Sequence, residues 1–325
     1  MPANPSSRAK LKPPALRSGD KVGIVAPASP FERAAFEAGC ARLRRLGYEP
    51  VFSPSIFDCD LFFAGSVERR VAELEEMFER DDVKAILCAR GGYGCNYLLG
   101  KLSADKIRKH PKIFMGYSDI TTLHTWMLDH VGLVTFHGPM LAKDFDAGSG
   151  IEESSWQAAT SGTSNWKADT RGVKAPIAGE AEGILYGGCL SLLAASLGTP
   201  YEVETEGTIL FLEDVNARPF QIDRMLMQLR LAGKFKNVRG IIFGEMLDCI
   251  QPGKQNYSLE EVVKRALSDL GIPLAFGLRS GHVSQANITL PLGVKAKLTA
   301  SDKVELTILE SATAATKPAA ARSKT

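Results

Sequence analysis

The chain has 325 residues, of which 45% are hydrophobic and 23% charged. This composition is average for soluble globular proteins, so it excludes wholesale disorder, collagen-like repeats and small disulfide-stapled folds. The formal net charge is only +2, and residues 1–18 and 311–325 contain basic residues but no acidic ones. A mildly acidic body between two basic ends gives no electrostatic footprint for a nucleic-acid partner.

The six cysteines are scattered, with no C-x-x-C pair and no spacing that suits a zinc site. Unclustered thiols in a chain of this length are typical of a reducing compartment. Residues 1–20 contain prolines and charges but lack the apolar core of a secretory signal. No run approaches the roughly 18 apolar residues of a membrane span. We therefore expect a cytoplasmic protein with no membrane association.

Short β-branched runs alternate with amphipathic segments up to about residue 150. This pattern predicts parallel strands joined by right-handed helical crossovers. Residues 19–150 are therefore interpreted as one doubly wound α/β domain, preceded by a basic tail at residues 1–18. The predicted strands are 21–27, 48–52, 84–89 and 113–117, and the predicted helices are 31–46, 67–78 and 119–130.

A second unit is predicted after a segment rich in Gly, Ser and Thr. That segment, residues 151–180, is interpreted as a linker, and residues 181–310 as a β/α domain. The Ala/Ser/Thr/Lys-rich residues 311–325 are expected to form a disordered tail. Within the second domain the predicted strands are 208–212, 238–243 and 304–309, and the predicted helices are 219–231 and 262–267.

Residues 116–119 (GYSD) join a predicted buried strand to a predicted helix, which is typical of a nucleophile elbow. Such a turn lifts the Ser118 hydroxyl above the sheet edge, beside helix N–H groups that favour developing negative charge. The elbow pattern G-x-S-x-G is incomplete because Ile120 stands where the second glycine would be. Serine is also a preferred helix N-cap. The tetrapeptide alone leaves both interpretations open.

Residues 90–94 (RGGYG) follow another predicted buried strand. Glycines at the carboxyl end of a strand let backbone amides approach a ligand closely, as an oxyanion hole or an anion cradle. A plain tight turn is an equal alternative, and the spacing fits neither a dinucleotide fingerprint nor a P-loop. Adjacent parallel strands would bring this loop and Ser118 to one sheet edge, where α/β proteins bind ligands.

A serine nucleophile needs a base and a group that orients the base. His282 lies in a polar loop after a strand-like run, where filling of the core does not explain it. His137 follows a predicted strand and is a candidate to line a pocket. Three further histidines lie in or beside helical stretches and are interpreted as structural: His110, His124 and His130.

Two carboxylates, Glu213 and Asp214, end the predicted strand at residues 208–212. Acidic groups at a strand terminus suit the task of holding an imidazole in one tautomer. Solvated loop charge is the alternative interpretation.

An ordered set of motifs resembles the LD-carboxypeptidase family, the murein tetrapeptide carboxypeptidases. The matching pieces, in family order over residues 15–310, are KVGIVAPASP, ARGGYG, MGYSD, TFHGPM, ILYGG, LFLEDV, IDRML, GIIFGE and GHVSQANITLPLG. The resemblance implies a flavodoxin-like or class I amidotransferase-like N-terminal domain joined to a swivelling β/α C-terminal domain, usually in a homodimer. It also implies a serine peptidase that uses no metal and no other cofactor.

The family's roles match residues of this chain. The resemblance implies that Ser118 is the nucleophile, Glu213 the acid and His282 the base of a Ser-His-Glu triad. The oxyanion hole would be formed by backbone amides of Asp119 and of the Gly91-Gly92 turn. Many members have GGN where this chain has Gly187-Gly188-Cys189, a departure that bears on substrate preference and leaves the triad intact.

The implied reaction is hydrolysis of the L,D peptide bond that releases terminal D-alanine from murein tetrapeptide during cell-wall recycling. An exopeptidase must also bind a free carboxylate, ideally with a bidentate arginine. Arg90 is the candidate, and the equal alternative is that it only ties down its own loop. The reserve arginines and further candidate substrate contacts are Arg218, Arg279, Tyr93, His137 and Gly188.

Two other hypotheses compete with this one. A self-immunity peptidase of the same fold group would cleave a peptide–nucleotide antibiotic with the same triad. A triad-free binding module would use the glycine-rich edge to hold a small anionic ligand. The joint presence of Ser118, Glu213 and His282 argues against the binding module, because a binder needs no such set. The expected partners are thus a small peptide substrate and a second copy of the chain.

Overall fold

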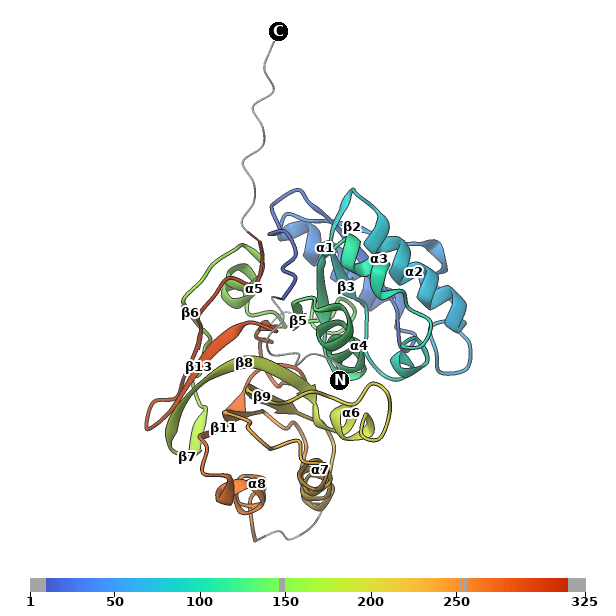
Figure 1. Cartoon of the computed structure of the whole chain (residues 1–325). Helices are drawn as coiled ribbons and strands as arrows, with labels where there is room; N and C mark the ends of the chain where they lie inside the picture. Colours follow the sequence, from blue (N-terminus) through green and yellow to red (C-terminus); the bar gives the residue numbers. More distant parts are fainter. Residues whose placement is uncertain (1–9, 146–149, 252, 254–255, 315–325) are drawn as a thin grey trace.

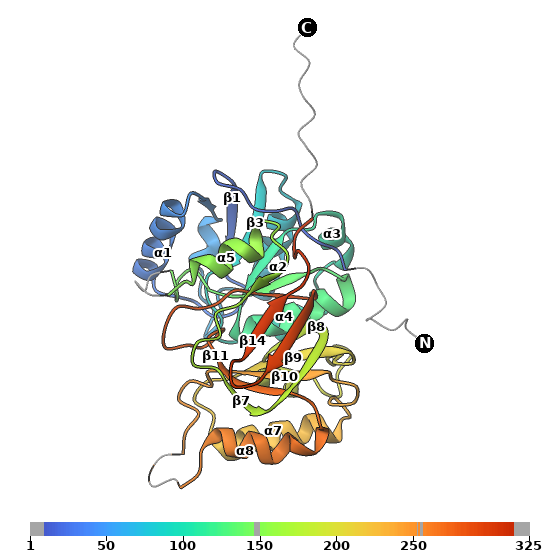
Figure 2. The same ribbon diagram turned by 90° about the vertical axis from the view of Figure 1, so that its left-hand side faces the viewer.

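The computed structural model describes residues 10–145, 150–251, 253 and 256–314. It contains two β-sheets, each flanked by helices, and the mixed α/β fold predicted from the sequence is confirmed. We call the part built on the first sheet the first lobe and the part built on the second sheet the second lobe. Figures 1 and 2 show the first lobe stacked above the second.

The first sheet has the strand order β12-β5-β4-β3-β1-β2, and all its neighbours except β12 and β5 are parallel. The order reverses between β1 and β3, and ligands of open α/β sheets bind at such a switch point, outside the carboxyl ends of the strands. The strands are β1 (Lys21–Val25), β2 (Glu49–Val51), β3 (Val83–Cys88), β4 (Ile113–Gly116), β5 (Thr135–His137) and β12 (Leu290–Leu292).

Helices cover both faces of this sheet. Helix α1 (Arg33–Arg45) packs Phe36 and Leu43 into one hydrophobic cluster, whereas α2 (Val67–Glu79) packs Leu74 and Phe78 into another. The sheet therefore has a hydrophobic core on each side, as expected for a doubly wound domain. The remaining helical segments of the first lobe are η2 (Pro54–Phe57), η3 (Cys95–Tyr97), α3 (Ala104–Lys109), η4 (Ser118–Ile120), α4 (Thr121–Trp126) and η5 (Met127–Val131).

The helix predicted at residues 119–130 differs from the structure, which has three consecutive segments there. A 3-10 turn (η4) leads into the short helix α4, and a π turn (η5) ends before Gly132, whose φ is +83°. Ser118 at the start has a φ of +64°, which a regular right-handed helix does not contain. The helical spacing of apolar residues predicts a helical segment, but it does not predict a change of helix type within that segment.

The second sheet has the order β6-β14-β13-β8-β9-β10-β11-β7, with a parallel centre from β8 to β11. Helices α7 (Pro219–Leu231) and α8 (Leu259–Leu267) lie on the side away from the first lobe in both views (Figures 1 and 2). No helix in the described part of the chain is long and apolar enough to cross a membrane. The other elements are β6 (Trp166–Lys167), β7 (Lys174–Ile177), β8 (Gly179–Cys189), α6 (Leu190–Ala195), β9 (Thr208–Glu213), β10 (Gly240–Gly244), η6 (Ser268–Leu270), β11 (Leu274–Leu278), β13 (Lys295–Ala300) and β14 (Glu305–Ile308).

Residues 151–180 were interpreted as a linker, but the structure gives them regular elements. Helix α5 (Glu153–Thr160) and the strands β6 and β7 all lie in this segment. Trp156 is only 3% exposed and its ring packs against Phe145 and Tyr48. Its polar composition hides this order, because the few apolar anchors are buried by partners far away in the sequence.

The C-terminal part of the chain also returns to the first lobe. Strand β12 pairs antiparallel with β5, so that Leu290 lies opposite His137. Ala312 and Thr313 are each 2% exposed, and Ala314 pairs with Pro14 of the basic N-terminal segment. Residues 311–314 are therefore packed, in contrast to the expected disordered tail, because they cover an apolar surface of the body. The rest of both predicted tails, residues 1–9 and 315–325, lies outside the described residues.

Candidate active site

Ser118 follows directly on β4 and begins the turn into α4. Its φ of +64° is a left-handed conformation that costs a non-glycine residue free energy, and such strain gathers at functional sites. Ser118 is partly exposed, whereas its neighbours Tyr117 and Asp119 are buried. The backbone therefore raises one hydroxyl out of the core at the carboxyl edge of the sheet, as the elbow interpretation predicts.

The Gly91-Gly92 loop lies over Ser118. A β-carbon at position 91 would stand 2.8 Å from the β-carbon of Ser118, so only glycine allows this approach. Ser29, from the loop after β1, fixes the turn: its N–H donates to the Gly91 carbonyl (3.2 Å) and its hydroxyl accepts from the N–H of Tyr93 (3.1 Å). In the described structure the N–H groups of Gly91 and Gly92 donate no hydrogen bond. They are available to a ligand.

Asp119 ties this loop to the elbow. Its buried carboxylate accepts a hydrogen bond from the N–H of Cys95 at 2.8 Å. Burial raises the pKa of Asp119, and the Cys95 N–H and Arg70 partly offset that shift. The N–H of Asp119 lies in the first turn of η4, where backbone donors have no helical partner.

Glu213 and His282 form the most tightly defined polar contact at this edge. Glu213 is the last residue of β9 and fully buried, and its Oε2 accepts from both the ring Nδ1 of His282 (2.7 Å) and the His282 backbone N–H (3.1 Å). Burial alone would raise the pKa of Glu213, but His282 and His137 together outweigh that effect and hold the pKa at about 2. Burial opposes protonation of His282, yet the Glu213 charge raises its pKa above the ordinary 6.5.

Two glycines make room for the Glu213 carboxylate. A β-carbon at Gly244 would lie 2.6 Å from the Glu213 β-carbon, and one at Gly281 would lie 2.6 Å from its Cδ. Gly281 also has a φ of +93°. The sequence around His282 therefore requires glycine for two reasons, one conformational and one steric.

The His282 loop is held by two residues that lie within the family motifs but have no predicted role. The Asn287 side chain accepts from the Gly281 N–H and donates to the Gly281 carbonyl, both at 3.0 Å. Glu245 accepts from the backbone N–H of Ser284 at 3.0 Å and from its hydroxyl. Only their polar character next to a predicted site histidine could have indicated them.

The two lobes bring Ser118 and His282 to one place. The ring of Tyr117, adjacent to Ser118, packs edge-on against the His282 ring with 5.0 Å between centroids. On the other side of the elbow, the N–H of Cys189 donates to the Thr121 hydroxyl at 2.9 Å. Ser118 itself makes no side-chain hydrogen bond within the described residues. Its hydroxyl is not engaged by His282 in this state, as is common before substrate binds.

The candidate substrate-binding residues differ in their exposure and in their partners. Arg90 is exposed and donates to the Pro30 carbonyl at 2.9 Å, which agrees with the alternative that it ties down its own loop. Tyr93 is 45% exposed beside the Gly91-Gly92 turn. Arg279 is paired with Asp169, whereas Arg218 is exposed at the N-cap of α7.

Gly188 and His137 do not face an open pocket. A β-carbon at Gly188 would stand 2.5 Å from the Thr121 hydroxyl, and the Cys189 side chain is buried. His137 is fully buried behind Glu213. The expectation that it lines a substrate pocket is therefore wrong for this structure, because β12 and the Ser280 loop cover it. His124, also buried, donates from Nε2 to the Gly116 carbonyl at 2.8 Å and so supports the elbow.

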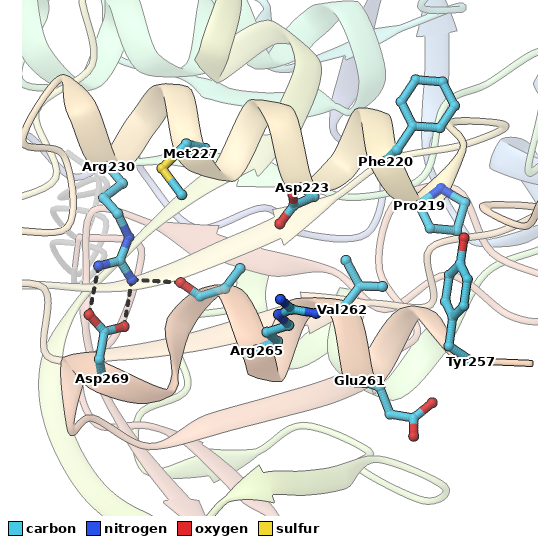
Figure 3. A pocket seen from close by; sticks show the side chains of 11 residues that line it. Pro219, Phe220, Asp223, Met227, Arg230, Tyr257, Glu261, Val262, Arg265 and Asp269 are labelled. Carbon is cyan, nitrogen blue, oxygen red and sulfur yellow. Dashed lines mark hydrogen bonds and ion pairs between the residues drawn. The ribbon is translucent and has the colours of Figure 1, made fainter.

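A large open groove lies elsewhere, between α7 and α8 (Figure 3). It has a volume of about 870 Å³ and contains none of the predicted triad residues. The Arg230–Asp269 ion pair closes one end, and Tyr257 and Pro219 lie at the other (Figure 3). The predicted triad residues lie at the carboxyl edges of the two sheets and not in this groove.

Comparison with known proteins assigns the family. Residues 22–138 match the LD-carboxypeptidase N-terminal domain and residues 182–298 match the LD-carboxypeptidase C-terminal domain. The chain therefore belongs to the LD-carboxypeptidase family.

Relatives and solved structures agree with this assignment. The chain is 40% identical to the probable murein peptide carboxypeptidase of Bacillus subtilis, over 90% of this chain and 92% of the relative. It is 30% identical to the murein tetrapeptide carboxypeptidase of Pseudomonas aeruginosa, over 92% and 98%. A structure of the microcin C7 self-immunity protein MccF with glutamyl sulfamoyl guanosine superimposes with a TM-score of 0.86 at 25% identity, covering 94% of this chain and all of that one. The muramoyltetrapeptide carboxypeptidase of Oxalobacter formigenes gives 0.79 at 30% identity, over 90% and 99%.

Proposed function

We propose that this chain is a serine-type L,D-carboxypeptidase that releases terminal D-alanine from murein tetrapeptide in cell-wall recycling. The observation that carries the proposal is the buried Glu213 carboxylate, which holds Nδ1 of His282 at 2.7 Å beside the strained Ser118 elbow. The names of the Bacillus subtilis and Pseudomonas aeruginosa relatives support the substrate class.

The proposed reaction is a two-step acyl transfer. Glu213 keeps the proton of His282 on Nδ1, which leaves Nε2 free to accept the proton of Ser118. Ser118 Oγ then attacks the carbonyl carbon of the L,D peptide bond, and the imidazolium protonates the nitrogen of the departing D-alanine. Water, activated by the same imidazole, cleaves the resulting acyl ester and restores the Ser118 hydroxyl.

Three backbone donors are proposed to stabilise the oxyanion. They are the N–H groups of Gly91 and Gly92, in the loop that approaches Ser118, and of Asp119, the residue after it; those of the two glycines donate no hydrogen bond in the described structure. Removing one such donor in comparable sites costs about 3–4 kcal/mol of transition-state stabilisation. Ser29 and Asp119 would hold this hole in shape before substrate arrives, which is the condition for electrostatic preorganisation.

Recognition of the terminal carboxylate remains a prediction for Arg90. Its guanidinium is exposed next to the Gly91-Gly92 turn, and one of its nitrogens donates to the Pro30 carbonyl. The other nitrogens would be free for a carboxylate, so Arg90→Ala should raise KM more than it lowers kcat. Tyr93 stays a predicted substrate neighbour, and Tyr93→Ala should likewise raise KM more than it lowers kcat.

A second candidate is a self-immunity peptidase that cleaves a peptide–nucleotide antibiotic. The TM-score of 0.86 to the MccF structure with glutamyl sulfamoyl guanosine favours it. The higher sequence identity lies with the murein peptide carboxypeptidases, at 40% for the Bacillus subtilis protein. We therefore give the murein substrate precedence, because closer sequence relatives share more of the residues that contact a substrate.

The direct test follows D-alanine release from murein tetrapeptide by the full chain. We expect release by the wild type and a loss of several orders of magnitude in Ser118→Ala, with unchanged thermal unfolding. Undiminished release by Ser118→Ala would refute the nucleophile. Cleavage of glutamyl sulfamoyl guanosine without cleavage of the tetrapeptide would favour the second candidate.

Cytoplasmic location and a homodimer belong to the same proposal. Murein tetrapeptide that returns for recycling is met inside the cell, and the unclustered cysteines fit a reducing compartment. Light scattering on the purified chain tests the dimer, and cell fractionation tests the location.

A further inference from the structure

The second oxygen of the Glu213 carboxylate faces a second histidine. Oε1 of Glu213 lies 3.8 Å from Nε2 of His137, and the side chains of both residues are fully buried. Neither atom has a hydrogen-bond partner in the described structure. Two buried polar atoms that face each other without a hydrogen bond would cost free energy. A proton held between them would remove that cost.

The other side of the His137 ring is already satisfied. Nδ1 of His137 lies 3.0 Å from the hydroxyl oxygen of Ser280, which in turn lies 2.8 Å from the Ile288 carbonyl. A serine hydroxyl has one proton and can also accept. If that proton goes to Ile288, Nδ1 donates to Ser280, and a ring that also bears a proton on Nε2 is a cation. If the hydroxyl turns, Nδ1 accepts from it, and a ring with a proton on Nε2 is neutral. Nδ1 therefore has a partner in either arrangement.

The gap between Nε2 and Oε1 is too short for water. A bridging molecule would need two hydrogen bonds of about 2.8 Å each, which places the bridged atoms farther apart than 3.8 Å unless the angle at the water is sharply bent. Without a proton at Nε2, a lone pair would face the carboxylate in a medium of low polarity, where the repulsion is strong.

We propose that His137 carries a proton on Nε2 and donates it to Oε1 of Glu213, which makes His137 a positioning residue for the triad acid. Glu213 then stands between two imidazoles, with His282 bonded at Oε2 and His137 at Oε1. This arrangement fixes the plane of the carboxylate and thereby the direction in which His282 presents Nε2. The catalytic part of the proposal rests on the proposed function.

The surroundings of His137 leave Glu213 as the one charged group that faces its ring among the described residues. From α4, His124 contributes a ring whose pKa burial lowers to about 3, so it is neutral. From the end of β4, Tyr117 has a pKa that burial raises well above 10, so it is neutral as well. Phe211 of β9 covers the ring at 5.1 Å between centroids, and the Ser280 hydroxyl contacts Nδ1.

Two substitutions separate the two nitrogens. In His137→Gln the side-chain amide reaches the position of Nε2 and keeps a donor for Glu213. In His137→Asn the amide reaches the position of Nδ1 and keeps only the Ser280 contact. We expect His137→Asn to lower kcat/KM for D-alanine release about 10- to 100-fold, the range for losing one buried hydrogen bond to a charge. His137→Gln should recover most of that loss.

The pH profile adds a readout that a structural role would not move. Removing the donor leaves more of the Glu213 charge to act on His282, so the acidic limb of kcat/KM should shift to higher pH in His137→Asn and stay in place in His137→Gln. Equal activities and equal acidic limbs in the two variants would overturn the positioning role.

A measurement on the wild type needs neither a variant that folds nor a substrate. Nitrogen-15 NMR of the full chain labelled at histidine reports which ring nitrogen bears a proton. We expect a protonated Nε2 on the buried histidine that contacts Glu213 at neutral pH. An unprotonated Nε2 there would overturn the inference even if D-alanine is released. A protonated Nε2 in a chain that releases no D-alanine would instead refute the proposed function and leave the His137–Glu213 hydrogen bond standing.

Discussion

Gly91 lies so close above Ser118 that a β-carbon on the glycine would stand 2.8 Å from the β-carbon of the serine. The contact joins the loop after β3 to the elbow after β4. It sets the position of the two proposed glycine donors relative to the proposed nucleophile, and the first prediction follows from it.

Gly91→Ala should reduce kcat for D-alanine release roughly 100-fold or more, because the methyl group pushes the loop and its N–H groups away from the oxyanion position. Because Gly91 is buried, the added methyl group should also lower the thermal midpoint, and circular dichroism at the assay temperature checks that the fold is retained. The matched control is Gly100→Ala, where the nearest atom is the Tyr201 hydroxyl at 3.6 Å and no activity change is expected. Similar activity in both variants would contradict the placement of the oxyanion hole.

Gly281→Ala should impair both folding and catalysis. A residue at a φ of +93° carries about 1–3 kcal/mol of strain, and the new methyl group would also meet the Glu213 carboxylate. The control Gly271→Ala has a positive φ of +65° and nothing within 4 Å, so it isolates the conformational cost. Chemical denaturation should show a loss in both variants, while D-alanine release should fall only in Gly281→Ala. Equal activity in the two would argue against a tight Glu213 socket.

Asn287→Ala should destabilise the protein by about 2 kcal/mol or more, because both polar groups of the buried Gly281 peptide lose their partner. The same change frees the loop that carries His282, so kcat should fall as well. Gln157→Ala removes an exposed amide from α5 and serves as the control, with near-native unfolding and activity. A native-like urea midpoint for Asn287→Ala would show that the two Asn287–Gly281 hydrogen bonds contribute little to stability.

The activity should depend on pH through His282. Burial lowers the pKa of His282, but the charge and hydrogen bond of Glu213, together with the charges of Asp214 and Asp144, raise it above 6.5. The acidic limb of kcat/KM should therefore lie above pH 6.5. Glu213→Gln removes the largest of the contributions that oppose burial, so the limb of the residual activity should move to lower pH. A limb that stays in place in Glu213→Gln would contradict the assignment of His282 as the base that Glu213 orients.

The same pair should stabilise the fold within a defined pH window. The raised pKa of His282 stabilises the folded state below pH 6.5, and this contribution is lost as pH rises through the folded value. The lowered pKa of Glu213 stabilises it above pH 4.5, and this contribution is lost as pH falls toward 2. The difference in unfolding free energy between wild type and Glu213→Gln should therefore be largest between about pH 4.5 and 6.5. A difference independent of pH would exclude the charged pair.

Local patterns in the sequence determined much of the architecture. The alternation of short apolar runs with amphipathic segments predicts the parallel order of the first sheet, because each element buries its own face against its immediate neighbours. The S-x-x-E spacing of Ser258 and Glu261 is typical of a capping box, and the structure forms it at the start of α8, with the Ser258 hydroxyl accepting from the Glu261 N–H at 3.1 Å. The ordered motifs indicated the family, and the resemblance also identified Ser118, Glu213 and His282 as the predicted triad.

Contacts between distant segments were decided only by the tertiary structure. Strand β12 joins β5 across about 150 residues of chain, and it is this return that buries His137 behind Glu213 instead of beside a substrate. The packing of residues 311–314, where Ala314 pairs with Pro14, is of the same kind. Residue type and spacing report what a segment can bury or bond, but the partner is chosen by how the whole chain closes. For that reason the identities of the proposed triad could be read from the sequence, whereas the groups that hold it in place could not.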